Sequence, residues 1–446
     1  MKSKFFTAVI IFCAGIGGIL YGYDIGVISG ALLFIQKVIP MTQGELGLIV
    51  GGMLGGSLVG TLSTGYLADQ FGRRTMTITA CVIFIVGVFG VLLANSFIFL
   101  FLSRLVLGVG VGIISVSVPL YLTEIAPAHI RGRSVTIFQL LLTFGIVLAY
   151  VVDLLFTPSG NWHGMFEVIL IPAMVLLLSM LFLPETPRWL LSKQRESAAE
   201  KVLLKTRTKK EALLELKQIK AGLKHTESNW RTLFSRCFWL PLTVSLVIVA
   251  CNQLTGINVL LQYAPLIVQK TGLHSDLASM FGTIGIGLVN FLGTILSFFL
   301  IDWFGRRALL ITGTAGIVCA YVALAVLPYL GLAAELQATL SLAGLIAYIA
   351  FFAIGPGVVV WLAISELLPT KVRGKAISLA LFVSSATGFV LSSVFLNLEH
   401  ALGMSGTYLL FAGSTLIYFL VAVFLLPETK NKTLEEIQQF YEKKMK

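Results

Sequence analysis

The amino-acid sequence predicts an all-α membrane protein whose twelve transmembrane helices form two pseudo-symmetric halves of six. Three observations carry this prediction: the composition, the recurrence of long apolar runs, and a set of polar motifs that occurs twice. Of the 446 residues, 57% are hydrophobic and only 12% are charged, whereas soluble domains carry about twice that charged fraction. Apolar runs of about 20 residues, the length that crosses a bilayer as a helix, recur along the whole chain.

Six apolar spans, a long basic segment and six more apolar spans follow one another. The twelve spans are approximately 5–36, 44–68, 75–95, 98–122, 133–154, 166–183, 238–269, 278–301, 308–328, 337–365, 376–397 and 404–426. We therefore expect an N-terminal half (1–183), a linker with amphipathic helices (184–237), a C-terminal half (238–429) and a tail (430–446). In the linker, Ala212, Leu216, Ile219 and Leu223 have the spacing of an apolar helix stripe, which favours a cytoplasmic helix over a separate catalytic domain.

A set of polar motifs occurs once in each half of the chain. The sequence Asp-Gln-Phe-Gly-Arg-Arg at 69–74 returns as Asp-Trp-Phe-Gly-Arg-Arg at 302–307. The other two matched pairs of segments are 124–132 with 366–374, and 184–186 with 427–429. The three offsets are 233, 242 and 243 residues, about half the chain each time. Internal repeats fix an architecture, so we expect the same fold in each half.

The distribution of basic residues predicts the orientation. The net charge is +11, yet all but three of the 32 Lys and Arg residues fall in the termini, in the even-numbered loops or at their edges. The exceptions are Lys37, Lys270 and Arg104. The positive-inside rule then places both termini in the cytoplasm of a multi-pass plasma-membrane protein. The positive charge is an orientation signal, so no nucleic-acid partner is expected. Five scattered cysteines predict neither a disulfide framework nor a metal site.

The repeated turns combine glycine, arginine and carboxylates on one side of the membrane. Glycine permits a tight turn, and the arginines can reach carbonyls of the preceding helix or a carboxylate from another motif. Charge that only sets topology is the alternative, but acidic residues contribute little to that signal. We interpret the set as a salt-bridge gate at the cytoplasmic face. Its expected members are Asp69, Arg73, Arg74, Glu124, Arg131, Glu185, Asp302, Arg306, Arg307, Glu366, Arg373 and Glu428.

Taken together, these motifs resemble those of the sugar porter family of the major facilitator superfamily, along essentially the whole chain. The segments that carry the resemblance are 22–24, 69–74, Arg104, 124–133, 184–189, 253–258, 302–307, 355–357 with Trp361, 366–373 and 427–429. The resemblance implies two six-helix halves, each with inverted three-helix repeats around a site at the membrane midplane. It implies a bacterial proton-coupled monosaccharide symporter in the cytoplasmic membrane.

Asp24 and Arg104 are charged residues inside apolar spans. Asp24 is mid-span in the first helix and Arg104 lies near the start of the fourth. A charge at the bilayer centre costs about 2.5–3.5 kcal/mol on insertion scales and usually marks an ion or substrate path. The alternative, a pair that only fixes packing, explains it less well, because such a pair is often worth no more than an apolar replacement. We expect proton coupling. The resemblance supports this, since the family's proton symporters carry Asp at this position and its uniporters commonly carry Asn.

A sugar presents many hydroxyl groups and no charge, so its site needs several uncharged hydrogen-bonding side chains around one cavity. The expected substrate-binding residues, which as a set match sugar-contact positions of the family, are Gln139, Asn252, Gln253, Asn258, Asn290, Trp361 and Ser384. Each amide alone could instead bridge helices. We also expect Thr255-Gly256 to loosen the seventh span. Three departures from the family pattern alter this cavity: Asn252 replaces a glutamine, Gln262 replaces a common tyrosine, and Ser384-Ser385 replaces an amide followed by tryptophan.

We therefore expect a secondary active transporter that imports a monosaccharide, hexose or pentose, with protons by alternating access. It should be no enzyme and need no cofactor or metal; its partners are the sugar, protons and the lipid bilayer, and it should be monomeric. A facilitative, uncoupled sugar or polyol carrier shares nearly every feature. A non-transporting sugar sensor would normally need a signalling tail longer than 430–446. A membrane enzyme would need a nucleophile–base pair or a metal-ligand spacing that the sequence does not display.

Overall fold

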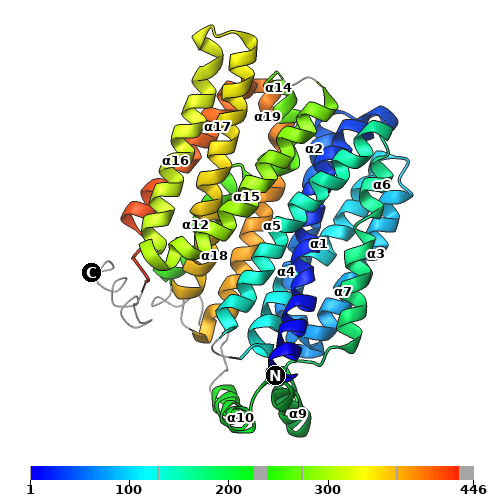
Figure 1. Ribbon diagram of the computed structural model, residues 1–446, viewed down its shortest axis with the longest axis vertical. Coiled ribbons are helices and arrows are strands. Elements are labelled where there is room, and N and C mark those ends of the chain that lie inside the picture. The colour runs from blue at the N-terminus through cyan, green and yellow to red at the C-terminus, as the bar shows by residue number, and fades with distance from the viewer. Residues whose placement is uncertain (1, 128–129, 225–238, 273–274, 368–369, 431–446) are drawn as a thin grey trace.

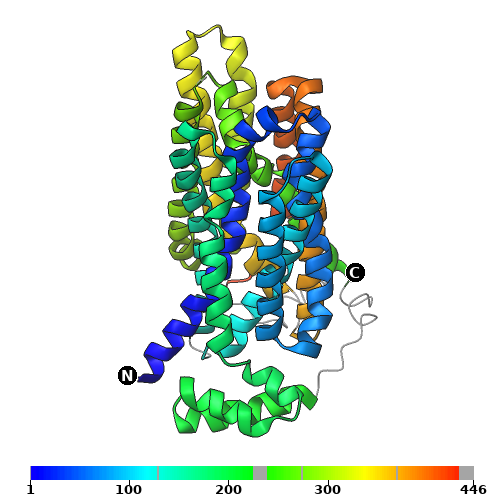
Figure 2. The same ribbon diagram turned by 90° about the vertical axis from the view of Figure 1, so that its right-hand side faces the viewer.

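Two bundles of long helices stand side by side, and short helices lie across one end of them (Figure 1). The computed structural model describes residues 2–127, 130–224, 239–272, 275–367 and 370–430, and the regular structure in those ranges is helical. The start of α1 projects from the bundle at the same end as the short helices (Figure 2). We call this the linker end and the opposite one the far end.

The N-terminal half contains five helices of 20 residues or more. Its elements are α1 (Lys2–Val38), α2 (Gln43–Phe71), α3 (Arg73–Leu92), α4 (Phe97–Ile125), α5 (Arg131–Phe156), η2 (Thr157–Ser159), α6 (Trp162–Glu167) and α7 (Leu170–Phe182). The last two together form the sixth membrane crossing, Trp162–Phe182. The linker contributes α8 (Pro187–Ser192), α9 (Glu196–Thr206) and α10 (Lys209–Lys224).

The C-terminal half repeats this order with more helix breaks. Its elements are α12 (Trp239–Leu254), α13 (Ile257–Gln262), α14 (Ala264–Lys270), α15 (Asp276–Phe304), α16 (Arg306–Val326), η3 (Leu327–Leu330), α17 (Ala334–Ile354), α18 (Pro356–Leu367) and α19 (Thr370–Phe424). Within the described residues, eleven stretches are long and apolar enough to cross a membrane, and the last of them covers 50 residues.

That last stretch accounts for two crossings. As a straight helix, 50 residues would be about 75 Å long, more than twice the ~30 Å hydrocarbon core of a bilayer. Gly403, at φ 69°, interrupts the helical backbone of α19. The segments on either side of this kink are the eleventh and twelfth transmembrane helices, which confirms the predicted fold of twelve.

The predicted loosening of the seventh span is a complete break between α12 and α13. Gly256 adopts the left-handed conformation with φ 83°. A break exposes carbonyl groups that water cannot solvate inside a bilayer, so other protein groups must satisfy them. The hydroxyls of Tyr321 and Tyr348 both donate to the carbonyl of Thr255, at 2.6 and 3.0 Å. The break is thus a supported part of the fold.

Glycine rows bring α2 very close to two neighbours. Gly47, Gly51 and Gly55 face α19, whereas Gly52, Gly56 and Gly60 face α4. A Cβ atom on Gly47 would lie 2.0 Å from the carbonyl oxygen of Ser393, and one on Gly56 would lie 1.9 Å from that of Leu105. One row therefore holds its own half together and the other lies against the opposite half.

The linker helices pack on the end of α4. Of the predicted apolar stripe on α10, Ala212 and Leu216 are buried and Ile219 is half-buried, while the side chain of Leu223 lies outside the described part. The buried Arg207 donates to the carbonyls of Ile125 and Ala126 at 3.1 and 3.2 Å. Because positive charge is favourable at a helix C-terminus, this contact anchors the linker to the N-terminal half.

Candidate functional site

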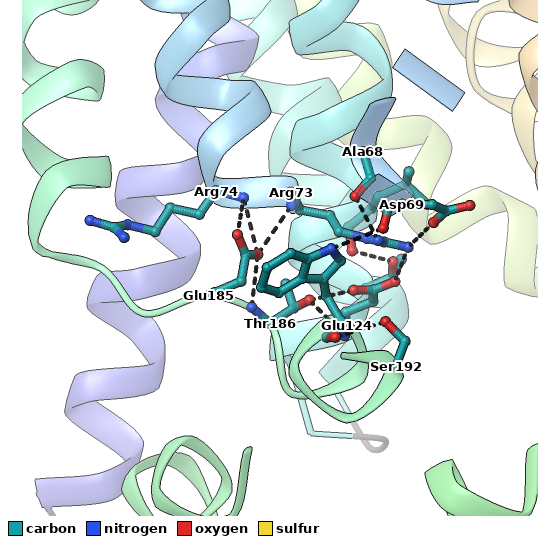
Figure 3. Close-up of polar contacts among 11 residues, drawn as sticks. Ala68, Asp69, Arg73, Arg74, Glu124, Glu185, Thr186 and Ser192 are labelled. Carbon is teal, nitrogen blue, oxygen red and sulfur yellow. Dashed lines mark hydrogen bonds and ion pairs between the residues drawn. The ribbon is translucent and has the colours of Figure 1, made fainter. Parts of the chain in front are cut away.

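The first repeated turn forms a compact group of charges at the linker end (Figure 3). The N-terminal charge cluster consists of Asp69, Arg73, Arg74, Glu124, Glu185 and Thr186. Nη2 of Arg73 lies 2.8 Å from Asp69 and 3.1 Å from Glu124. Its Nη1 donates to the carbonyl of Ala68 at 2.9 Å. Arginine thus reaches both kinds of partner that the sequence predicted, a carbonyl of the preceding helix and carboxylates.

Glu185 accepts backbone hydrogen bonds at the start of α3. Its carboxylate receives the N–H groups of Arg73 and Arg74, each at 3.1 Å. Free N–H groups at a helix N-terminus form a natural site for an anion. Gly72 makes room for it, since a Cβ at this position would lie 2.2 Å from Glu185 Oε2. With φ 99° and ψ 156°, Gly72 also has a conformation open essentially to glycine alone.

Thr186 closes the N-terminal cluster on its other side. Its hydroxyl donates to Glu124 at 2.6 Å. Arg74 extends away from the carboxylates, and its guanidinium donates to the carbonyls of Met180 and Leu181 at 2.7 and 2.8 Å. The cluster consequently ties α2, α3, α4 and the segment after α7 into one unit.

The second repeated turn forms the C-terminal charge cluster, which consists of Arg306, Arg307, Glu366, Glu428 and Thr429. Glu428 receives the N–H groups of Arg306 and Arg307, both at 3.1 Å. Nη2 of Arg306 lies 3.0 Å from Glu366. The hydroxyl of Thr429 donates to Glu366 at 2.5 Å. The duplication seen in sequence is therefore also a duplication of hydrogen bonds.

The described ion pairs of each charge cluster connect residues of the same half. Among the residues whose side chains are described, no ion pair joins one cluster to the other, and the exposed Asp302 forms none. The predicted gate residues Arg131 and Arg373 have side chains outside the described part of the chain. The described contacts therefore show two turns, each held by hydrogen bonds and ion pairs within its own half.

Asp24 and Arg104 meet in the middle of the N-terminal half. Arg104 Nη1 lies 2.7 Å from Asp24 Oδ1, and both side chains are fully buried. Arg104 also lies over the ring of Phe166, 5.8 Å from its centroid. Asp24 Oδ2 and Arg104 Nη2 have no hydrogen-bond partner in the described structure. A buried pair with unused polar atoms on both partners is poorly satisfied as a structural element.

Three of the predicted sugar-site residues form one hydrogen-bonded chain across the break in the seventh span. Asn258 Nδ2 donates to Gln253 Oε1 at 2.7 Å, and Gln253 Nε2 donates to the hydroxyl of Ser384 at 2.7 Å. These groups come from α13, α12 and α19. The break at Gly256 is what allows Asn258 to approach Gln253 from the next helix.

The other predicted sugar-site residues are not joined to that chain by hydrogen bonds between described side chains. Asn252 and Asn290 are buried, and Asn252 Oδ1 has no partner in the described structure. Gln139 on α5 is half-buried, as is Trp361, which packs against the core around α12 and α18.

The structure also pairs residues that the sequence alone did not connect. The hydroxyl of Ser392 donates to Gln262 at 2.8 Å, so the amide that replaces the family's tyrosine bonds within the C-terminal half. Tyr150 on α5 donates to the carbonyl of Leu261 on α13 at 2.7 Å and thereby joins the two halves. No sequence signal marks either pair, because their members are more than 100 residues apart.

Known proteins are similar to this chain over nearly its whole length. The profile of the family described as "Sugar (and other) transporter" matches residues 10–441. The "Probable metabolite transport protein CsbC" of Bacillus subtilis is 38% identical, over 100% of this chain and 97% of its own. The "Galactose-proton symporter" of Escherichia coli is 33% identical, over 98% and 95%.

A solved structure agrees over the full length. The proton:xylose symporter XylE of E. coli, in complex with 6-bromo-6-deoxy-D-glucose, superimposes with a TM-score of 0.83 at 29% sequence identity. The superposition covers 98% of this chain and 99% of XylE. This multi-pass membrane protein therefore belongs to the sugar transporter family, as a sugar porter of the major facilitator superfamily.

Proposed function

We propose that this chain is a proton-coupled symporter that carries a neutral hexose or pentose into a bacterial cell by alternating access, without enzymatic activity. The observation that carries the proposal is the buried ion pair of Asp24 and Arg104. The positive-inside rule favours a cytoplasmic location for the linker end and both termini, in the cytoplasmic membrane. The far end is then extracellular. Proton coupling also agrees with the names of the galactose and xylose symporters reported above.

Proton binding to Asp24 is the step that links the gradient to movement. The proton affinity of a carboxylate depends on the distance of a neighbouring cation. Asp24 on α1 and Arg104 on α4 lie on separate helices, so a shift between these helices changes that distance. Protonation on the extracellular side weakens the ion pair and frees α1, and release follows on the cytoplasmic side.

The sugar binds between the halves in this proposal. Gln139 contributes from the N-terminal half, and Gln253, Asn258, Asn290 and Trp361 contribute from the C-terminal half. Asn252 and Ser384 complete the polar wall. An amide that donates to another amide, as Asn258 does to Gln253, keeps its orientation before the ligand arrives. A preorganised polar wall loses less entropy on binding and rejects molecules that lack the matching hydroxyls.

The two charge clusters are proposed to limit the cytoplasmic opening. Alternating access in this fold is largely a rigid-body rocking of one half against the other. The internal hydrogen bonds of each cluster keep the ends of its helices together as that half moves. Arg131 and Arg373 follow Glu124 and Glu366 in sequence at matching positions, and we propose both as members of the cytoplasmic gate.

The test is the isosteric variant Asp24→Asn in proteoliposomes. Counterflow, the exchange of labelled for unlabelled sugar, needs no net proton movement and should persist. Uphill accumulation driven by an imposed proton gradient should be lost. Glu335→Gln, which changes an exposed carboxylate at the start of α17, is the matched control and should accumulate sugar normally. Intact accumulation in Asp24→Asn would contradict the proton role.

A pH jump separates symport from facilitated transport in the wild-type protein. Acidifying the outside of proteoliposomes at equal sugar concentrations should drive D-xylose or D-galactose inward and should move protons with it. A facilitative carrier would show equal fluxes in both directions whatever the pH difference. The pH of the vesicle interior, followed with a fluorescent dye, reports the proton flux directly.

A further inference from the structure

Asp153, like Asp24, is a fully buried carboxyl group, and the transport cycle proposed above does not use it. It lies in the last turn of α5, and its side chain is fully buried. Oδ2 accepts the backbone N–H of Gly30 in α1 at 3.1 Å, while Oδ1 has no hydrogen-bond partner in the described structure. A Cβ on Gly30 would lie 2.5 Å from the carboxyl group. The carboxyl group is thus wedged into the contact between two helices.

The described surroundings of Asp153 supply no positive charge that pairs with it. The titratable groups close enough to interact with it are Tyr23 from α1 and Tyr150 from its own helix. Both phenols direct their protons elsewhere, Tyr23 to the carbonyl of Met165 and Tyr150 to that of Leu261. No described Lys, Arg or His pairs with Asp153, and neither η2 nor α6 contributes such a partner. Asp24, in contrast, has Arg104.

An ionised carboxylate in such a place would be far less stable than the neutral acid. Burying an isolated charge costs much more than burying a polar group with one unmade hydrogen bond. One backbone N–H at 3.1 Å is a single, uncharged donor. We propose that Asp153 is a second proton-binding carboxyl group of the transport cycle, with its proton on Oδ1 in the conformation described here. The proposal rests on the proposed function as a proton-coupled carrier.

The position of Asp153 indicates which side its proton comes from. Gly30 follows Asp24 by six residues along α1, so the two carboxyl groups lie about 9 Å apart along the helix axis. Asp153 is the one nearer the far end, which the proposed orientation places outside the cell. Asp153 therefore exchanges its proton with the extracellular side.

Asp153 is also one helical turn from a contact between the halves. Tyr150, three residues earlier on the same face of α5, donates to Leu261 across the interface at 2.7 Å. At the end of α1, Lys37 lies 3.7 Å from Asp276 of the other half. Loss of the proton from Asp153 creates a buried charge between α1 and α5. This charge favours a conformation in which water reaches it, and thereby opens the far end.

Counterflow measured against pH tests the proposal. The full-length protein is reconstituted, and exchange of D-xylose or D-galactose, whichever the wild type carries, is measured from neutral to alkaline pH with equal pH on both sides. Wild-type exchange should fall about fivefold or more, as expected when one essential proton is lost. Asp153→Asn, which mimics the neutral acid, should change by less than about twofold over the same range. Asp24→Asn should keep the alkaline fall, which would assign it to Asp153.

An infrared measurement tests the proton itself, independently of transport. Protonated carboxyl groups have a carbonyl stretching band that ionised ones lack. Wild type and Asp24→Asn should both show a band that disappears at alkaline pH, and Asp153→Asn should lack it. The proposal is overturned if this band is absent from the wild type, even should Asp153→Asn fail to fold. It is equally overturned if Asp153→Asn retains the band or the wild-type pH profile. If the wild type carries no sugar at all, the proposed function fails while the band still tests Asp153.

Discussion

In both halves a glutamate receives the backbone N–H groups of two consecutive arginines, but the side chain of the first arginine is used differently. Among the described side chains, Arg73 pairs with two carboxylates, Asp69 and Glu124, whereas Arg306 pairs with one, Glu366. The ion pair of the N-terminal half is also less exposed to solvent. The side chains of Arg73 and Glu124 are 11% and 7% exposed, against 17% and 28% for Arg306 and Glu366.

The comparison shows which features both copies of the turn retain and which differ between the halves. The turn itself depends on glycine at positive φ and a carboxylate at the helix N-terminus, and both features occur twice. Ion pairing on the outside of the turn is not needed to form it. The additional pairing in the N-terminal half, where the linker also docks, makes that half the better anchored of the two. Four sets of variants test this comparison, from the largest expected effect to the smallest.

Removing the first arginine should separate the halves most clearly. Arg73→Ala leaves Glu124 buried without its cation, and breaking a buried pair costs about 3–5 kcal/mol. Arg306→Ala leaves a more exposed carboxylate that water can solvate, so we expect about 1–2 kcal/mol. Thermal unfolding in detergent, followed by tryptophan fluorescence, measures both. Equal losses in the two variants would show that burial does not distinguish the clusters.

Substitution of the turn glycine should affect both halves alike. Gly72→Ala and Gly305→Ala each force alanine into a backbone conformation that costs about 1–3 kcal/mol. Their Cβ atoms would lie 2.2 Å from Glu185 and 2.6 Å from Glu428. Gly413→Ala, where a Cβ meets nothing within 4 Å, is the control and should be neutral. A loss confined to one half would mean that the shared turn geometry is not what the duplication preserved.

Trp189 provides a contact of the N-terminal half that has no counterpart among the described residues of the C-terminal half. Its indole N–H donates to the carbonyl of Asp69 at 3.1 Å. Trp189→Phe keeps the ring and removes this donor, which should cost about 1 kcal/mol in unfolding free energy. Trp303→Phe is the control, because Trp303 is largely exposed and its indole has no described hydrogen bond. The same unfolding assay should show no shift for the control, and a shift there would count against the asymmetry.

The smallest effect is expected at the first residue of each turn. Asp69 is 71% exposed in its ion pair with Arg73, so Asp69→Asn should cost less than about 1 kcal/mol. Asp302→Asn should change nothing, since Asp302 forms no described ion pair. The Asp69 effect should shrink at high salt, because salt screens exposed charges. A salt-independent loss would indicate that Asp69 has a more buried role than its exposure suggests.

Most of the fold was predictable because apolar span length and duplicated turns are local signals. The twelve crossings, the amphipathic linker helix and the break at Gly256 all follow from short stretches of sequence. The second interruption of the seventh span, at Tyr263 between α13 and α14, was not predicted. Pro265 lies in the first turn of α14, but proline is also tolerated within transmembrane helices.

The candidate site was predictable as a set of residues but not as a set of contacts. Asp24 and Arg104 stood out because charges are rare in apolar spans. The bond from Gln253 to Ser384 joins residues 131 apart, and only packing of α12 on α19 brings them together. Asp153 went unnoticed because it lies at the edge of its predicted span, where an acidic residue is normally solvated. Burial by α1 is a tertiary effect, and no sequence window contains it.

The glycine rows of α2 have a consequence for leakage. Where a Cβ on Gly47 would come within 2.0 Å of a carbonyl oxygen of α19, neither a lipid chain nor a file of water has space, because carbon atoms need about 4 Å between centres. In the conformation described here, the seam between α2 and α19 is therefore closed to water and ions at this level. Because the two helices belong to opposite halves, we expect a larger residue at Gly47 to hold the halves apart there, and the proton leak of sugar-free proteoliposomes would detect it.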